Sequence, residues 1–323
     1  MKQPKKVVKT LLGWALSASV LAVTPAFAQL VSVSSIVEHP ALDSIRDGVK
    51  DALAAEGYTE DKGLKWQFQT AQGNTAIAAQ IARKFVGDGS DVIVAISTPS
   101  AQAVVAATKS IPILYSGVTD PVVAQLVPSW EPSGTNVSGV SDMLELEKQL
   151  ELIKQIAPDA KTVGMVYNPG EANSVVVVER LRELLSANDM NLVEATAART
   201  VDVGAAARSL VGKADVFYTN TDNNVVSAFE SLVKVGNDAK IPIIASDTDS
   251  VPRGAIAALG VNYYDLGQQT GKLVARVLKG EKVGDIASET SEKLELYVNP
   301  AAAQKQGVTL DEAFLQSATK IIE

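Results

Sequence analysis

The chain of 323 residues contains no cysteine, one histidine and few aromatic side chains, which make up 5% of its residues. The lack of cysteine excludes disulfides, thiolate metal sites, iron–sulfur clusters and cysteine nucleophiles. A single histidine, His39, argues against a Ser-His-Asp triad and against a multi-histidine metal site. The formal net charge of -8 argues against a nucleic-acid-binding protein, because such a protein needs a basic face.

The first 28 residues have the pattern of a cleaved signal peptide. A lysine-rich start is followed by a mostly apolar run from Leu11 to Val23, and Ala26-Phe27-Ala28 provides a small-x-small cleavage pattern. The apolar run is too short to span about 30 Å of hydrocarbon, and no second run of about 20 residues follows. We therefore expect export with cleavage after Ala28. A lipid anchor at that point would need a cysteine, so none is expected.

The remaining chain is long enough for two hydrophobic cores. Short β-rich runs alternate with segments in which apolar residues recur every three or four positions, as in amphipathic helices. This alternation is typical of parallel sheets that are covered by helices on both faces. The sequence therefore predicts an α/β protein with two doubly wound parallel-sheet lobes. The expected strands are Val31–Val37, Leu64–Ala71, Asp91–Ser97, Ile111–Gly117 and Thr135–Ser141 in the first half, and Lys161–Asn168, Asn191–Ala197, Ala214–Asn220, Ile241–Asp247 and Ala255–Val261 in the second.

Short polar side chains cluster where the predicted strands end and helices begin. Ser97, Thr98 and Ser100 flank one such helix start, and Thr119 lies in the next turn. Similar clusters occur in the second half, in the segments 167–174, 220–224 and 246–250. Ligands of open α/β sheets bind at the carboxyl ends of the strands, beside helix N-termini. The clusters in both halves favour a polar cleft between two lobes over ordinary turn chemistry.

The catalytic and phosphate-binding motifs that we tested do not fit. Gly267 and Gly271 resemble a phosphate loop, but only three residues separate them, and they lie inside a helical pattern. No Gly-x-Ser-x-Gly elbow is present. His39 is expected at a helix start near the cleft, where packing or a polar contact is favoured over catalysis.

Four aspartates could face the cleft, namely Asp120, Asp142, Asp222 and Asp247. Two of them could act as acid and base or bind a hard cation. A single buried carboxylate opposite a ligand ammonium, with hydroxyl and amide groups around it, accounts for the same residues more simply. Binding without chemistry is therefore the preferred interpretation.

Several segments, taken in order and spacing, resemble a known family along essentially the whole mature chain. They are 37–43, 97–102 and 117–121 in the first half and 167–174, 221–224 and 263–271 in the second, with sequences such as Ser97-Thr-Pro-Ser-Ala-Gln102 and Tyr167-Asn-Pro-Gly-Glu-Ala-Asn-Ser174. The chain resembles the periplasmic substrate-binding proteins of ABC transporters, specifically the type I family that includes tryptophan/tyrosine-binding members.

The resemblance implies a two-lobed, Venus-flytrap receptor without catalytic activity, whose ligand lies between the lobes. The hinge crossings would fall near Ser141, Val261 and Ile286. The first lobe would then comprise residues 29–141 and 262–286, and the second lobe residues 142–261 and 287–323. The ligand would be an amino acid, with aromatic or branched side chains favoured. The ligand-binding residues implied by the family pattern are Ser35, Ser97, Thr98, Ser100, Thr119, Asn173, Ser174, Thr221, Asp222 and Asp247.

The expected partners are the small-molecule ligand and an ABC permease and ATPase complex in the inner membrane. We expect no cofactor, no metal and no nucleic acid, and a monomeric protein. Two alternatives remain open: a ligand sensor for a membrane receptor, and a secreted enzyme that uses paired cleft aspartates. A DNA-binding repressor of related fold is disfavoured, because the signal peptide lies where its helix-turn-helix would be.

Overall fold

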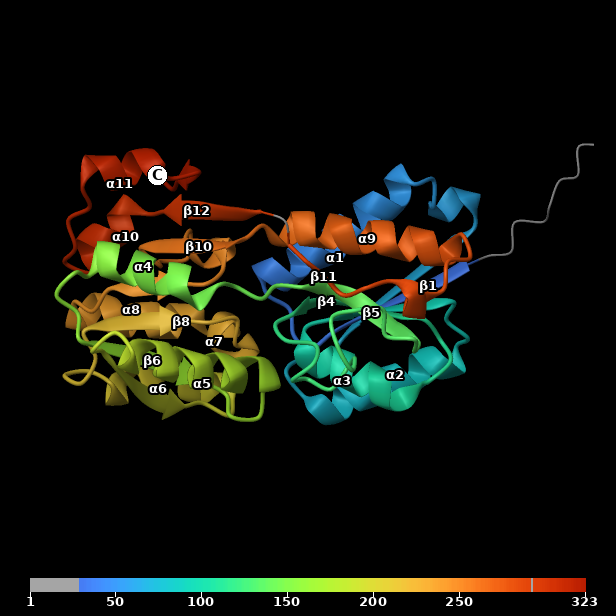
Figure 1. Cartoon of the computed structure of the whole chain (residues 1–323), viewed down its shortest axis with the longest axis horizontal. Coiled ribbons are helices and arrows are strands. Elements are labelled where there is room, and N and C mark those ends of the chain that lie inside the picture. Colours follow the sequence, from blue (N-terminus) through green and yellow to red (C-terminus); the bar gives the residue numbers. More distant parts are fainter. Residues whose placement is uncertain (1–28, 292) are drawn as a thin grey trace, which may run out of the picture.

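The computed structural model describes residues 29–291 and 293–323; the predicted signal peptide, residues 1–28, lies outside them. Two sheets, each covered by helices, lie end to end along the longest axis of the molecule (Figure 1). We call the elements around the six-stranded sheet the first lobe and those around the seven-stranded sheet the second lobe. In the described residues, no helix is long and apolar enough to cross a membrane.

The first lobe has the strand order β11-β5-β4-β3-β1-β2, with all described pairings parallel. Helices α1 and α9 cover one face, and α2 and α3 cover the other (Figure 1). Its elements are β1 (Gln29–Ser35), α1 (Pro40–Ala55), the 3-10 turn η1 (Glu60–Lys62), β2 (Leu64–Thr70), α2 (Thr75–Gly87), β3 (Val92–Ile96), α3 (Thr98–Ala107), β4 (Ile113–Val118), β5 (Val137–Ser141), α9 (Tyr263–Leu278), η4 (Val283–Asp285) and β11 (Glu289–Thr290).

The second lobe repeats this winding in the order β13-β12-β10-β9-β8-β6-β7. Strand β12 runs antiparallel to β10 and is the exception to the predicted parallel pattern. The elements of the second lobe are α4 (Leu146–Ile156), β6 (Thr162–Tyr167), α5 (Ala172–Ser186), β7 (Asn191–Thr196), η2 (Thr200–Asp202), α6 (Val203–Ser209), β8 (Val216–Thr219), α7 (Asn223–Ser227), α8 (Phe229–Ala239), β9 (Ile243–Ala245), η3 (Thr248–Ser250), β10 (Ala257–Val261), β12 (Leu294–Val298), α10 (Pro300–Lys305), α11 (Glu312–Ser317) and β13 (Lys320–Ile321).

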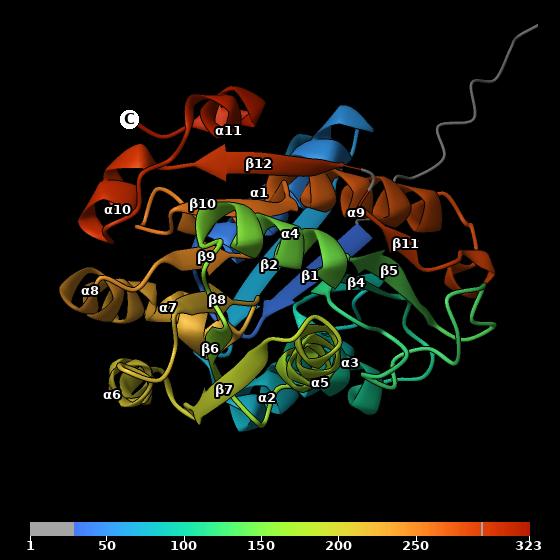
Figure 2. The ribbon, with the colours of Figure 1, turned by 60° about the vertical axis from the view of Figure 1, so that its left-hand side comes forward.

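The chain passes between the two sheets three times: after β5, after β10, and between β11 and β12. Strand β11 pairs with β5 of the first lobe, so the third passage lies after Thr290 and not near Ile286. The expected boundary at 286 was therefore too early, because a strand of two residues has no pattern that sequence reasoning can detect. In the turned view, α5 of the second lobe lies against α3 of the first (Figure 2).

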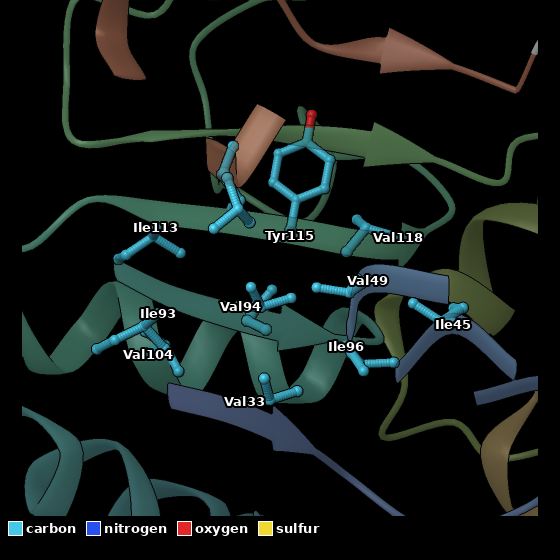
Figure 3. Close-up of a cluster of buried hydrophobic side chains, with 14 of the residues drawn as sticks. Val33, Ile45, Val49, Ile93, Val94, Ile96, Val104, Ile113, Tyr115 and Val118 are labelled. Carbon is cyan, nitrogen blue, oxygen red and sulfur yellow. The ribbon is translucent and has the colours of Figure 1, made fainter. Parts of the chain in front are cut away.

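The cores are built from strands that are apolar throughout. Every residue of β3 is buried, as expected for a central parallel strand that is covered on both faces. Figure 3 shows the packing of strand and helix residues in the first lobe; Val33, Val94 and Ile96 lie among Ile45, Val49, Val104 and Val118.

Helices α1 and α9 approach each other so closely that glycine is needed at the contact. A Cβ atom on Gly267 would lie 2.2 Å from the carbonyl oxygen of Ile45, and one on Gly48 would lie 2.2 Å from that of Tyr264. Real Cβ atoms do not come this close to backbone oxygens. The glycines that resemble a phosphate loop therefore lie within a helix and permit helix packing.

Candidate ligand-binding site between the lobes

A narrow pocket lies between the two lobes. Only about 10 Å³ of it is open to a water-sized sphere, so the side chains around it nearly fill it and a larger ligand needs them to move apart. Both lobes and the first passage between them contribute to it. Its lining residues are His39, Ala41 and Leu42 from the start of α1, Tyr263 from the start of α9, Asp142 from the passage after β5, and Thr221, Asn223, Val226 and Asp247 from the second lobe.

Helix starts position the polar residues of the pocket. His39 is the N-cap of α1, and Pro40 follows at the first helical position, where its missing N–H costs nothing. Tyr263 begins α9, whose N-cap Asn262 accepts hydrogen bonds from two backbone N–H groups. Asp247 caps the 3-10 turn η3. Since strand ends and helix starts meet at one edge of each sheet, the winding brings these residues to the cleft.

Two buried carboxylates, Asp142 and Asp247, face the pocket; they are 5% and 1% exposed. Oδ1 of Asp142 accepts a hydrogen bond from the Thr119 hydroxyl at 3.2 Å, and Oδ2 accepts one from the Tyr263 hydroxyl at 2.8 Å. Asp247 accepts from the backbone N–H of Ser250 at 2.8 Å and from its hydroxyl at 2.7 Å. Burial raises the pKa of both carboxyls, and the nearby charge of Asp247 raises the pKa of Asp142 further.

Neither of these carboxylates has a cationic partner in an ion pair within residues 29–291 and 293–323. His39 does not supply a charge, because burial and then the positive charge of Arg253 lower its pKa to about 3. A cationic group that enters the pocket would therefore be favourably placed, since it offsets the cost of burying two carboxylates. The described residues contain no group of His, Asp or Glu side chains that could hold a metal ion.

Asp222 lies in the second lobe but outside the pocket lining. Its Oδ1 accepts hydrogen bonds from the backbone N–H groups of Asn224 and Val225, both at 3.0 Å. Its Oδ2 accepts from the N–H of Asn168 and from the Ser174 hydroxyl, both at 2.6 Å. With four protein donors, this carboxylate holds the strand ends together in the described structure.

A fourth buried carboxylate, Glu171, acts on the pocket through Asn223. Its Oε2 accepts hydrogen bonds from the backbone N–H and the side-chain amide of Asn223, and from the Asn173 amide at 3.1 Å. Burial and the charge of Asp222 raise the pKa of Glu171 to about 7. Because Asn223 lines the pocket, Glu171 and Asp222 together fix one of its walls.

The structure brings only part of the predicted ligand set to the pocket. Thr221 and Asp247 line it directly. Three others use their side chains within the protein: Ser35 donates to the Val37 carbonyl, Thr119 to Asp142, and Ser174 to Asp222.

Asn173 and the cluster of Ser97, Thr98 and Ser100 are buried outside that lining. The hydroxyls of all three residues in the cluster are buried and have no hydrogen-bond partner in the described structure. Ser97 also has a φ of 76°, a backbone conformation that is costly for a residue with a Cβ atom. Unpartnered buried hydroxyls beside a strained residue at the start of α3 are typical of a binding surface.

Sequence reasoning assigned no ligand contact to seven of the nine residues that line the pocket, and four of these seven have polar side chains: His39, Asp142, Asn223 and Tyr263. His39 and Asp142 were expected near the cleft, but nothing in the sequence ranked Asp142 above the other aspartates. Asn223 and Tyr263 lie within segments that carry the family resemblance, at or next to a helix start, and this position was the available signal.

The model of the ABC transporter substrate-binding protein family matches residues 30–322. The chain belongs to this family. It is 46% identical over 269 residues to a tyrosine-binding protein of Clostridioides difficile, which covers 83% of this chain and 78% of that protein. The family match and the two sheets confirm the predicted fold class.

Two solved structures show how this substrate-binding protein is arranged. A Streptococcus pneumoniae ABC domain in complex with L-Trp is 33% identical, with a TM-score of 0.88 over 91% of this chain and 99% of that chain. The ligand-free, open structure of a substrate-binding protein with adhesive properties from Clostridium difficile is 41% identical, yet its TM-score is 0.69 over 91% of this chain and 99% of that chain. The higher TM-score with the ligand-bound structure, despite the lower identity, shows that the lobe arrangement of this chain is more similar to that of the complex than to that of the open structure.

Membership of this family shows the general class of function of the chain. These are extracytoplasmic solute-binding proteins and not enzymes. A small-molecule ligand and an ABC permease are therefore the partners that the family implies.

Proposed function

We propose that this chain binds an amino acid, with an aromatic side chain favoured, between its lobes and delivers it to an ABC permease and ATPase complex in the inner membrane. The observation that carries the proposal is the pair of buried carboxylates, Asp142 and Asp247, that face one pocket. Neither forms an ion pair within the described residues, and Arg253 acts on Asp247 only through its nearby positive charge, which partly offsets the rise in the pKa of that carboxyl that burial causes. An ammonium group supplies the missing charge and donates hydrogen bonds to carboxylate oxygens.

The side chain and the carboxylate of an amino acid also have complementary groups in the protein. Ala41, Leu42, Val226 and the ring of Tyr263 provide apolar and aromatic surface for a side chain. The start of α3 lies outside the pocket lining. Its unpartnered hydroxyls in the Ser97–Ser100 cluster and the positive end of the helix dipole would bind the carboxylate of a ligand that extends beyond the pocket. The names of the relatives, a tyrosine-binding protein and an L-Trp complex, support an aromatic amino acid.

Lobe closure would couple binding to delivery. A ligand that contacts His39 and Leu42 on one lobe and Asp247 on the other binds the closed arrangement more tightly than the open one. Only this difference in affinity shifts the population of molecules toward the closed arrangement. The closed form would then be recognised by the permease. We further propose a monomer in the periplasm, released by cleavage after Ala28 and without a lipid anchor.

Thermal unfolding against a ligand panel tests the function. The mature chain is unfolded and refolded to remove bound ligand, then melted with each of the amino acids, and with sugars and purines as controls. A ligand at 100 times its Kd stabilises the folded state by about 2.7 kcal/mol, which raises the Tm measurably. We expect the largest rise with tyrosine or tryptophan. No rise with any amino acid, together with a rise for a sugar or purine, would overturn the assignment.

A further inference from the structure

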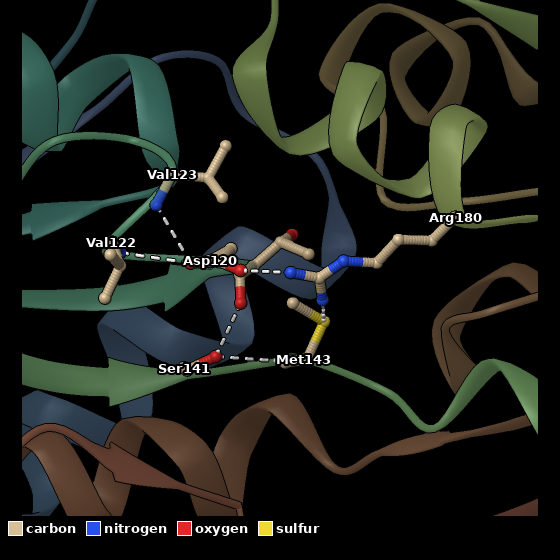
Figure 4. Close-up of polar contacts among 7 residues, drawn as sticks. Asp120, Val122, Val123, Ser141, Met143 and Arg180 are labelled. Atoms are coloured by element: carbon tan, nitrogen blue, oxygen red, sulfur yellow. Dashed lines mark hydrogen bonds and ion pairs between the residues drawn. The ribbon is translucent and has the colours of Figure 1, made fainter. Parts of the chain in front are cut away.

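An ion pair outside the ligand pocket joins the two lobes. Nη2 of Arg180, on α5 of the second lobe, lies 2.7 Å from Oδ2 of Asp120, which follows β4 of the first lobe (Figure 4). Oδ1 of Asp120 accepts hydrogen bonds from the backbone N–H groups of Val122 and Val123, both at 3.0 Å. The aspartate is thus fixed by its own lobe, and the arginine reaches it from the other.

We propose that Arg180 and Asp120 form a latch that stabilises the closed arrangement and thereby sets the affinity and release rate of the ligand. Within residues 29–291 and 293–323, this ion pair alone joins the two lobes; the others connect residues of one lobe, or Lys293 with Glu295 at the start of β12. Neither residue lines the pocket, so the latch acts on the lobes and not on the ligand. The effect on ligand affinity rests on the proposed function.

The surroundings of the pair make it stronger than an ordinary surface ion pair. The side chain of Asp120 is 6% exposed, whereas that of Arg180 is 47% exposed. A carboxylate that is shielded from water interacts more strongly with a nearby charge than an exposed one does. Nη1 of Arg180 also contacts the sulfur of Met143 at 3.6 Å, beside the first passage between the lobes. Lobe opening that separates α5 from the β4 turn would break both contacts.

A contact that exists only in the closed arrangement raises its population. Apparent affinity falls in proportion to the fraction of molecules that are competent to bind, so loss of the latch weakens every ligand by the same factor. The latch therefore changes affinity without changing specificity. Because salt screens partly exposed charges, part of the affinity should also be lost at high ionic strength.

The test is a double-mutant cycle with Arg180→Gln and Asp120→Asn, measured by calorimetry with L-tyrosine. The asparagine keeps the oxygen that accepts from Val122 and Val123, so the turn is preserved. We expect each variant to weaken binding about three- to tenfold, in the range of a partly buried ion pair, and the double variant to be no weaker than either single variant. Stopped-flow release of L-tyrosine should be faster by a similar factor.

Arg182→Gln is the matched control. Arg182 lies on the same helix and pairs with Glu194 of its own lobe at 2.7 Å, so its loss changes the net charge equally without touching the other lobe. Its Kd should stay within twofold of wild type. Additive effects of Arg180→Gln and Asp120→Asn, or a wild-type Kd in Arg180→Gln, would overturn the latch.

A readout without ligand separates the latch from the proposed function. The chain has no cysteine, so spin labels can be attached to cysteines introduced at exposed Gln80 on α2 and Val201 on η2. The distance distribution between these labels reports the fraction of closed molecules even if the wild-type protein does not bind L-tyrosine, so it still tests the latch. A smaller closed fraction in Arg180→Gln, but not in Arg182→Gln, supports the latch, whereas three identical distributions refute it.

Discussion

Replacement of Asp247 by asparagine separates ligand binding from folding. Asp247 is 1% exposed and receives two hydrogen bonds, both from Ser250, which leaves acceptor positions open toward the pocket. Asparagine retains one oxygen for the N–H of Ser250 but removes the charge. A hydrogen bond to a charged group contributes about 1.5–3 kcal/mol, so Asp247→Asn should weaken the binding of an amino acid by about 10- to 100-fold.

Asp222→Asn is the informative counterpart, because Asp222 has four protein donors and lies outside the pocket lining. We expect Asp222→Asn to lower the Tm, since at least one of these four donors loses its acceptor. Calorimetry with L-tyrosine and thermal unfolding are measured on both variants. A wild-type Kd in Asp247→Asn would refute the assignment of the ammonium contact, whatever the effect of Asp222→Asn.

Two further predictions concern pH and helix packing. Ammonium binding needs ionised carboxylates, and burial raises the pKa of Asp247 and Asp142. Calorimetry should therefore show that L-tyrosine affinity falls on acidification, with the fall beginning above the usual aspartate pKa of about 3.9, and stronger binding in acid would contradict this. Gly267→Ala should lower the Tm by several degrees, because its Cβ would lie 2.2 Å from a backbone oxygen and overpacking costs about 1–3 kcal/mol. Gly87→Ala, with open space around its Cβ, should leave the Tm unchanged or slightly higher in the same melts, and an equal loss in both variants would refute the packing argument.

The ten strands β1 to β10 follow the predicted runs, because buried parallel strands are apolar throughout and are separated by long amphipathic helices. β3 and β9, both fully buried, are clear examples. The late elements were not predicted. β11 and β13 have two residues each, and a strand of that length is defined by its neighbours and not by its own pattern. This is why the third passage was placed too early.

The site was only partly predictable, because sequence position gives the end of a strand but not the partners of a side chain. Ser174 and Asp222 lie at the expected turns, yet they bond to each other at 2.6 Å. Thr119 is likewise used by Asp142. Asp247 and Asp222 are alike in sequence context, and only their hydrogen bonds show which one has oxygens available for a ligand. The contribution of Tyr263 depends on how α9 returns to the first lobe, which is a property of the whole fold.

The central claim is that an amino acid is held between the lobes by its ammonium group. Calorimetry on the refolded mature chain tests this most directly, with L-tyrosine compared with 3-(4-hydroxyphenyl)propionate, which has the same ring and carboxylate but no ammonium. We expect L-tyrosine to bind with a saturable isotherm. The analogue should bind at least about 100-fold more weakly, because it lacks the ammonium group that makes charged hydrogen bonds to the carboxylates. Equal affinity for the two compounds would contradict the account.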